Sequence, residues 1–351
     1  MAVRVTRFPE NPLITPEQVT PSEPGWQVVG TFNPGATLHH GEVVLLVRVA
    51  ERPRAGNPEE VVAPVLDVTS DPPRVRPRSF RRDDPEVVVI DPRWFSYQGQ
   101  VYLTSISHLR LARSRDGRHF TIDTGPTFSA GTWYESFGVE DPRIAEIEGR
   151  YVVTYTSVSE HGIATSLATT KDLRAFERRG IIFAPENRDV SVLPEKVGGN
   201  YFCHHRAVAR HIGGFDMWAA DSPDLVHWGR HRRLMSPRAG TWEAGRIGGG
   251  SVPFRTPRGW LTIYHGADQS NRYCLGALLC DGDDPGRVIA RSAEPLLAPE
   301  APYEVSGFLG NVVFTCGTVV QGDELTIYYG AADQYVCGAV VSVEDVLESL
   351  A

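Results

Sequence analysis

The sequence predicts an all-β protein, a five-bladed β-propeller with a short C-terminal helix, on three observations. A glycine turn followed by an apolar strand recurs along the chain, beginning at positions 40, 98, 148, 198, 258 and 322. The 34 glycines and 26 prolines supply turn-forming residues throughout. The recurring unit is 50 to 64 residues long and made of short strands, which is typical of sheets repeated around an axis.

The repeated hairpins follow one another in the order HGEVVLLVRVA, QGQVYLTSIS, EGRYVVTYTS, GGNYFCHHRA, RGWLTIYHGAD and GDELTIYYGAAD. Several are followed by small residues, an Asp-centred turn and an aromatic residue, as in LARSRDGRHF, LATTKDLRAF and AADSPDLVHW. Two β-sandwiches would not repeat this spacing with this lettering. The first and last hairpins lie on end segments that are each too short for a four-stranded blade, so we join them into one closing blade. This gives five blades in a single domain over residues 1–351.

Helical periodicity is convincing only near the end, in SVEDVLESL, where Ser342 is placed to cap the helix. The start, MAVRVTRFPENP, has no apolar signal-peptide core, and no apolar run is long enough to span a membrane. The net charge of −8 argues against nucleic acid or an anionic membrane as a partner. Five cysteines without a CxxC pair suggest neither a zinc site nor a disulfide framework, so we expect a reducing, cytoplasmic location.

The stretch GVEDPRIAEIEGRYVV places Asp141 just before the first strand of a repeat, where a propeller opens its channel. Because a proline follows, we expect the Asp141 backbone to be extended. The alternative is an aspartate that caps a turn, which is our interpretation of Asp91 in the similar stretch DPRWFSYQGQ. Only the later copy adds Gly138 and Glu140, and this asymmetry indicates a chemical task for Asp141.

Polar residues within otherwise apolar inner strands are the next candidates. Arg48 lies in VVLLVRVA and either extends to solvent from a strand end or points into the channel toward an anion. Lys196 in LPEKVGG and Arg206 in HHRA have the same two interpretations, and His265 in IYHGAD is either structural or part of the site. The GGGSV stretch at 248 fits neither a nucleophile elbow nor a phosphate loop, because no helix follows it.

One physical difference separates two reaction classes. An inverting glycosidase that uses water needs an acid and a second carboxylate as base. An enzyme that uses inorganic phosphate needs only the acid, because phosphate is already an anionic nucleophile, but it must hold that anion with cations. The pattern here is one leading carboxylate, Asp141, with five basic candidates: Arg48, Arg143, Lys196, Arg206 and His265. This favours the second class.

The chain also resembles glycoside hydrolase family 130, the inverting β-mannoside phosphorylases and their hydrolase relatives, from about Asn11 to the C-terminal helix. The resemblance rests on six motifs in order: FNPGA followed by LLVRVA, SHLRLARSRDG, GVEDPRI, LPEKVGGNYFCHHR, GWLTIYHGAD, and YEVSGFLGNVVF with LTIYYGAAD. The fold that it implies is a five-bladed β-propeller.

The resemblance also implies roles for individual residues. Asp141 would be the catalytic acid, passing its proton through the 3-hydroxyl of the bound mannose to the glycosidic oxygen. Sugar contacts would come from Asn33, Arg48, Glu140 and Asp333, and phosphate contacts from Arg143, Lys196, Arg206 and His265. Hydrolytic members lack such basic residues and have a carboxylate base instead, so the basic residues favour phosphorolysis.

The sequence therefore predicts an enzyme that needs phosphate as co-substrate and no cofactor or metal. It would cleave a β-mannoside with inversion to α-mannose 1-phosphate and a shortened sugar. The rivals are an inverting β-mannosidase, with Glu140 or another acid as base, and a non-catalytic sugar-binding propeller. The loops over 52–90 match no motif and are expected to shape the acceptor subsite, so the linkage and the acceptor stay open. So does the oligomeric state, which includes the option of a homo-oligomer.

Overall fold

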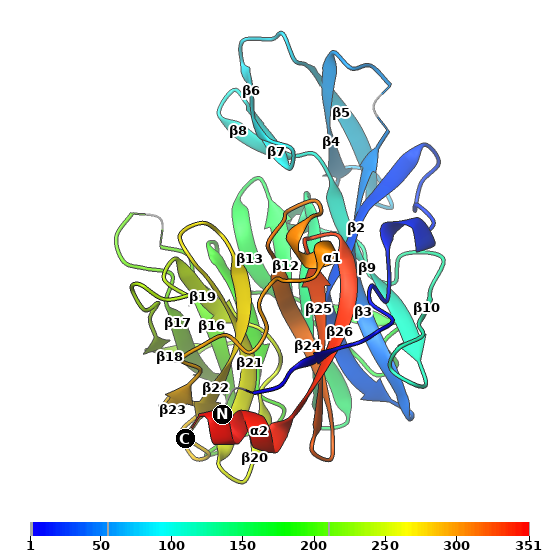
Figure 1. Cartoon of the computed structure of the whole chain (residues 1–351). Helices are drawn as coiled ribbons and strands as arrows, with labels where there is room; N and C mark the ends of the chain where they lie inside the picture. The colour runs from blue at the N-terminus through cyan, green and yellow to red at the C-terminus, as the bar shows by residue number, and fades with distance from the viewer. Residues whose placement is uncertain (1–2, 55, 210, 351) are drawn as a thin grey trace.

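The computed structural model describes residues 3–54, 56–209 and 211–350, and they form an almost entirely β structure (Figure 1). Helical segments are short: α1 (Pro302–Val305), α2 (Val343–Ser349) and the 3-10 turns η1 (Pro16–Gln18) and η2 (Trp133–Glu135). The predicted C-terminal helix is confirmed, and Ser342 caps it because its Oγ accepts a hydrogen bond from the Asp345 backbone N–H at 3.0 Å. Among the described residues, no helix is long and apolar enough to cross a membrane.

Most strands fall into five antiparallel groups that follow one another along the chain, and a parallel bridge joins the first two groups into one eight-stranded sheet. The first group contains β2 (Trp26–His39), β3 (Glu42–Pro53), β9 (Ile106–Ser114) and β10 (Thr121–Ile122). The second contains β11 (Gly138–Ile147), β12 (Arg150–Ser159), β13 (Gly162–Thr170) and β14 (Phe176–Phe183). The third contains β15 (Asn187–Val192), β16 (Tyr201–Ala207), β17 (Met217–Ser222) and β18 (Gly229–Met235).

The last two groups complete the series. The fourth contains β19 (Arg246–Gly249), β20 (Phe254–Thr256), β21 (Gly259–Ala267), β22 (Tyr273–Cys280) and β23 (Val288–Arg291). The fifth contains β24 (Val313–Gln321), β25 (Glu324–Ala331) and β26 (Tyr335–Ser342), with β1 (Thr6–Arg7) paired to β26. The N-terminal segment therefore finishes a group that the C-terminal segment begins, and Figure 1 shows the two termini near each other.

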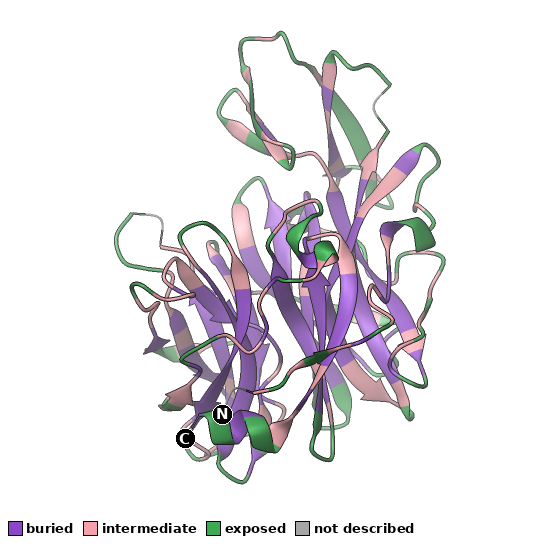
Figure 2. Cartoon of the chain, viewed as in Figure 1, coloured by how far each residue is buried: buried purple, intermediate pink, exposed green. Residues whose placement is uncertain are grey.

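The apolar cores lie between neighbouring groups, where buried strand faces meet (purple in Figure 2). Leu46 and Val153 share a core between the first and second groups, and the same arrangement joins the second to the third and the third to the fourth. Further cores join the fourth group to the fifth and the fifth back to the first. Consecutive packing thus returns to its starting point, although the sheets themselves do not close into one another.

The membership of the groups corrects one part of the sequence interpretation. The hairpin at 40 belongs to a complete first group, and the N-terminal segment contributes β1 and a bridge of Ile14 to Val336 to the fifth group. The hairpin at 98 begins no group, because its strands lie in a separate sheet of β6 (Val87–Asp91), β7 (Trp94–Tyr97) and β8 (Gln100–Leu103). The grouping predicted from the sequence therefore contains two opposite errors in the number of groups. It merges the hairpins at 40 and 322 into one group, and it counts the hairpin at 98 as a group.

The sheet β6–β8 and the hairpin of β4 (Glu60–Asp67) and β5 (Arg74–Arg81) form an insertion between β3 and β9. In Figure 1 the insertion stands away from the other sheets at the top of the view. Its own small core includes Phe95 and Tyr102 and continues onto Phe137, just before β11, and Val158 of β12. This packing fixes the insertion beside the strand ends that carry Asp141.

Candidate functional site

A pocket of about 390 Å³ collects most of the predicted residues. This volume is ordinary for a site that takes a small ligand. The predicted residues in its lining are Asn33, Arg48, Glu140, Asp141, Arg206, His265 and Asp333. They come from the first, second, third, fourth and fifth groups of strands, so the site exists only when the groups pack together.

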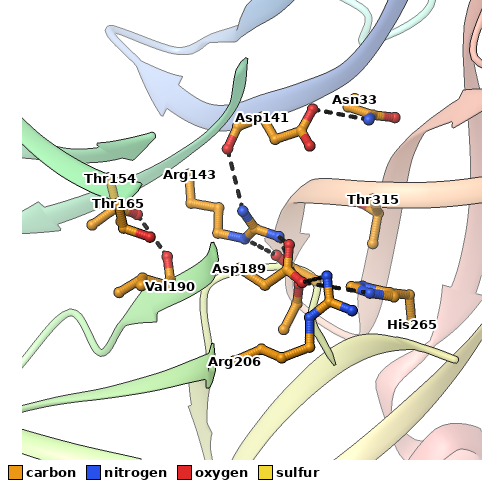
Figure 3. Close-up of polar contacts among 12 residues, drawn as sticks. Asn33, Asp141, Arg143, Thr154, Thr165, Asp189, Val190, Arg206, His265 and Thr315 are labelled. Atoms are coloured by element: carbon orange, nitrogen blue, oxygen red, sulfur yellow. Dashed lines mark hydrogen bonds and ion pairs between the residues drawn. The ribbon is translucent and has the colours of Figure 1, made fainter. Parts of the chain in front are cut away.

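Two β-bulges present Asp141 and Asn33 to the pocket. The β11–β12 register shifts between Glu140 and Arg143, and the β2–β3 register shifts between Phe32 and Gly35. Within these bulges Asp141 has φ +48° and Asn33 has φ +47°, and such bulges re-aim a side chain out of the strand alternation. The expectation of an extended Asp141 is therefore wrong. Asn33 Nδ2 donates to Asp141 Oδ1 at 2.9 Å (Figure 3).

Arg48 ties the carboxylates together. Its Nη1 donates to Asp141 Oδ1 at 3.0 Å, its Nη2 to Glu140 Oε1 at 2.6 Å and its Nε to Ser107 Oγ at 3.0 Å. Arg48 thus points into the pocket, and the alternative of a strand-end arginine in solvent is wrong. Burial disfavours the Arg48 cation, but Glu140 and Asp141 outweigh burial and raise its pKa.

Two neighbouring carboxyl groups hold their protons more tightly than usual. Burial raises the pKa of Glu140, and Asp141 adds to the effect while Arg48 opposes it. Burial raises the pKa of Asp333 to about 6, although Arg48 opposes that shift as well. This part of the pocket therefore contains three carboxyl groups around the Arg48 guanidinium: Asp141, which the motif pattern singled out, and Glu140 and Asp333, which the family resemblance added.

The second part of the pocket is a cluster of nitrogen donors around a buried carboxylate. Asp189 Oδ2 lies 2.7 Å from Arg206 Nη2 and 3.6 Å from His265 Nε2 (Figure 3). Burial opposes the Asp189 charge, but the neighbouring cations, of which Arg206 has the largest effect, lower its pKa to about 2. Burial lowers the pKa of His265 to about 3, which favours the neutral imidazole near pH 7.

Several nitrogens of this cluster have no hydrogen-bond partner within the described structure: Arg188 Nε, Arg206 Nε and both ring nitrogens of His265. Buried polar groups without partners are costly and are usually satisfied by a ligand or ordered water. The arrangement therefore suits an anion with several oxygens.

Arg143, which the sequence analysis assigned to phosphate, is not part of the pocket lining. Its Nε donates to the Gly250 carbonyl at 2.8 Å, its Nη2 to the Gly249 carbonyl at 2.6 Å and its Nη1 to the Asp141 carbonyl at 3.2 Å. Its Nη2 also lies 3.3 Å from Asp189 Oδ1. Arg143 therefore links the strand that carries Asp141 to the Asp189 carboxylate that pairs with Arg206.

The close packing around Arg143 and Asp189 also explains why the GGGSV stretch has three glycines. A Cβ on Gly248 would lie 2.5 Å from Asp189 Oδ2, and one on Gly250 would lie 2.3 Å from the Ile263 carbonyl. The glycines therefore let β19 approach Asp189 and His265 closely, and Gly249 and Gly250 offer their carbonyls to Arg143.

Lys196 is the second predicted phosphate residue that the structure does not bring to the pocket. Its Nζ pairs with Glu148 at 3.1 Å and lies 4.5 Å from the centre of the Tyr201 ring. The reason is strand geometry: Lys196 precedes β16 and Arg206 is near its other end, and an extended strand advances about 3.3 Å per residue. Because Lys196 and Arg206 lie in one sequence motif, the sequence alone predicts them at the same site.

The lining residues that sequence reasoning missed include Arg93, Arg188, Asp189 and Tyr273. Arg188 and Asp189 are adjacent charged residues at the start of a strand that follows a turn. A charged residue in that position is the signal that drew attention to Asp141. Asp91 is a turn cap as interpreted, because its Oδ1 accepts from the Arg93 backbone N–H at 2.7 Å. The same turn nevertheless carries Arg93 into the pocket wall.

Comparison with known proteins agrees with this geometry. The model of glycoside hydrolase family 130, described as beta-1,4-mannooligosaccharide phosphorylase, matches residues 84–351. The chain is 45% identical to the beta-1,2-mannobiose phosphorylase of Listeria innocua over 99% of both chains. It is 41% identical to the 1,2-beta-oligomannan phosphorylase of Thermoanaerobacter sp., over 69% of this chain and 80% of that one.

Solved structures give the same relationship. The Listeria innocua phosphorylase in complex with beta-1,2-mannobiose superposes with a TM-score of 0.95 at 45% identity, covering 99% of each chain. A second solved structure comes from work on members of the family that are glycoside hydrolases and target beta-1,2 mannosidic linkages in Candida mannan. It has a TM-score of 0.74 at 27% identity, covering 98% of this chain and 95% of that one.

Proposed function

The chain belongs to glycoside hydrolase family 130, and on that premise we propose that it is a phosphorylase of β-1,2-mannobiose. It uses inorganic phosphate and releases α-mannose 1-phosphate and mannose. The observation that carries the proposal is that one pocket holds both the acid Asp141, with Asn33 and Arg48, and the donor cluster of Arg188, Arg206 and His265. The linkage is proposed from the relatives that act on β-1,2-mannosides.

In the proposed reaction, Asn33, Arg48, Glu140 and Asp333 bind hydroxyls of the mannosyl unit that is transferred. A phosphate oxygen attacks C1 from the face opposite the leaving sugar, so the β-linkage becomes an α-phosphate. Asp141 supplies the proton that the leaving oxygen needs, through the 3-hydroxyl of the same mannose. Such general acid catalysis contributes about 10²–10⁴ in rate. The reaction is thus mannosyl transfer to phosphate, and it needs no cofactor.

The donor cluster is what favours phosphate over water. Arg188 and Arg206 provide positive charge, and neutral His265 provides a directed N–H, so a phosphate is held and aligned before it attacks. The carboxylates that could activate water are engaged elsewhere: Glu140 is paired with Arg48 at 2.6 Å and Asp189 with Arg206 at 2.7 Å. The hydrolase alternative would need Asp333 as its base.

We propose further that the five strand groups are the blades of a single five-bladed propeller domain, with the insertion as an addition to its first blade. The closed sequence of cores between consecutive groups supports this arrangement. So does the position of the pocket, whose lining comes from all five groups.

The test is the phosphate dependence of β-1,2-mannobiose cleavage, followed by NMR to identify the sugar product. We expect α-mannose 1-phosphate in millimolar phosphate and very slow cleavage in phosphate-free buffer. Equal rates with and without phosphate, giving free mannose, would establish the hydrolase instead.

A pair of variants tests the anion cluster. Arg188→Ala removes a charge-assisted contact of about 1.5–3 kcal/mol, so the KM for phosphate should rise by one to two orders of magnitude. Lys196→Ala is the matched control, because it also removes one cation but from a side chain outside the pocket. An equal rise of the phosphate KM in both variants would contradict the assignment.

A further inference from the structure

We propose a second carbohydrate-binding site, centred on Trp133, on the face of the β12–β13 hairpin that is turned away from the catalytic pocket. The proposal rests on the proposed function for the identity of its ligand, a β-1,2-linked mannan chain. The observation behind it is an exposed aromatic groove lined by Trp133, Tyr134, Ser159, His161, Ala164, Ile181 and Pro185.

Trp133 is unusual among the aromatic residues of the described chain. Its side chain is 55% exposed, and it is the only tryptophan among the large exposed hydrophobic residues there. It lies at the start of η2, and its ring meets the His161 ring edge-on at 5.5 Å and the Tyr134 ring at the same distance. An exposed indole held by neighbouring rings is a ready surface for stacking.

The groove adjoins the catalytic pocket through one hairpin. Val158 and Ile163 line the pocket, while their neighbours Ser159 and Ala164 line the groove. Successive residues of a strand point to opposite faces, so the two sites lie back to back on β12 and β13. On the far wall, Pro185 lies three residues before Arg188 of the donor cluster.

The ligand chemistry fits a β-mannosyl unit. In a β-linked mannopyranose the axial hydrogens on C1, C3 and C5 lie on one face of the ring, and the axial 2-hydroxyl lies on the other. The hydrogen-bearing face is apolar and can stack on the indole. The hydroxyls at the ring edge can then reach the polar atoms of Ser159, His161 and Tyr134.

A second protein chain is the less suitable occupant. Stable protein interfaces bury roughly 800 Å² on each partner around an apolar centre. Trp133 is the one large exposed hydrophobic residue of this groove, and the others in the described chain, such as Val88, Val89 and Ile90 of β6, belong to other elements. One indole is enough for a sugar ring and too little for an interface.

The test is affinity electrophoresis in native gels that contain soluble β-1,2-mannan, with the protein in the Asp141→Asn background so that the polymer is not degraded. We expect the mannan to retard this protein, and Trp133→Ala to weaken the apparent affinity about tenfold. Trp133→Phe should keep most of the retardation, and Trp133→Leu, which is apolar but cannot stack in the same way, should lose it. In the active background, Trp133→Ala should leave kcat and KM for β-1,2-mannobiose unchanged.

Three outcomes would overturn the proposal. The first is equal retardation of all variants, and the second is a loss of mannobiose turnover in Trp133→Ala. The third is a change in the native mass of Trp133→Ala without any change in its retardation by mannan. The last would assign the groove to contact between copies of the chain. The proposed function fails separately, because wild-type protein would then give no phosphate-dependent cleavage of mannobiose whatever the gels show.

Discussion

The tripeptide Asp-Pro-Arg occurs at 91–93 and again at 141–143, and the two copies use their charged residues in opposite ways. In the second copy Asp141 faces the pocket, while Arg143 is buried and bonded to backbone carbonyls. In the first copy Asp91 caps its own turn, and Arg93 faces the pocket.

The difference follows from the sheet that surrounds each copy. The second copy lies within β11, which is hydrogen-bonded to β12 and bridged to β9, so Arg143 is only 2% exposed. The first copy lies in the small outlying sheet, where the Arg93 side chain is 46% exposed. The same three letters therefore do not decide which residue meets a substrate. The burial of the surrounding sheet does.

The largest expected effect is on the acid of the second copy. Asp141→Asn keeps the shape of the side chain and its contacts with Asn33 and Arg48 but cannot release a proton. We expect kcat for phosphorolysis to fall about 10²–10⁴-fold with the melting temperature nearly unchanged. Initial rates of α-mannose 1-phosphate release measure this, and near-normal turnover would remove Asp141 from its role.

The arginine of the second copy should affect folding rather than phosphate binding. Arg143→Met leaves Asp189 with one cation fewer and two glycine carbonyls without a donor, and breaking such a buried pair costs about 3–5 kcal/mol. Urea denaturation should show this loss. If stability is kept and the phosphate KM rises instead, the original assignment of Arg143 to phosphate was right.

The sequence predicted the acid side of the site well because its residues lie in motifs whose chemistry is local. Asn33, Arg48, Glu140 and Asp141 are in the pocket as predicted. The donor cluster was predicted only in part, since Arg206 and His265 line the pocket and Lys196 and Arg143 do not. Bulges break the alternation of strand side chains, so the direction in which Arg143 points cannot be read from its position.

The limits for the fold have a similar cause. A glycine turn followed by an apolar strand predicts a hairpin, but it does not say to which sheet the hairpin belongs. The hairpin at 98 has the same pattern as the others and lies in the insertion, because β6 rather than β9 is its neighbour. Pairing that no hairpin announces, such as the parallel bridge of β11 to β9, is likewise a property of the packed molecule.

The two copies of the tripeptide act in opposite directions on Asp333. The Asp141 charge raises the pKa of Asp333, and the Arg93 charge lowers it. The folded protein holds the Asp333 proton with a pKa of about 6, above the unfolded value of about 3.9. Its stabilising contribution is therefore complete below about pH 4 and is lost as the pH rises through 6, with a total of about 3 kcal/mol.

Denaturation curves at pH 4, 5, 6 and 7 for wild type and Asp333→Asn measure this contribution. The difference between the two should favour the variant increasingly as the pH rises. Arg93→Ala should move the transition to higher pH and Asp141→Asn to lower pH. A difference that does not vary with pH would show that Asp333 titrates normally.

The smallest effects are expected from the first copy. Arg93 is a half-exposed cation on the pocket wall, where a charged contact contributes about 1 kcal/mol or less. Arg93→Ala should therefore change the KM for mannobiose a few-fold and leave the phosphate KM unchanged.

Asp91→Asn keeps a side-chain oxygen that can cap the turn and loses only the exposed ion pair with Arg93, whose N–O distance is 2.9 Å. Its turnover should therefore match wild type, in contrast to Asp141→Asn. Parallel kinetics of these two asparagine variants test the comparison directly, because the substitution and the tripeptide are the same and only the surrounding sheet differs. Equal losses in both would mean that the first copy also works at the reacting atoms.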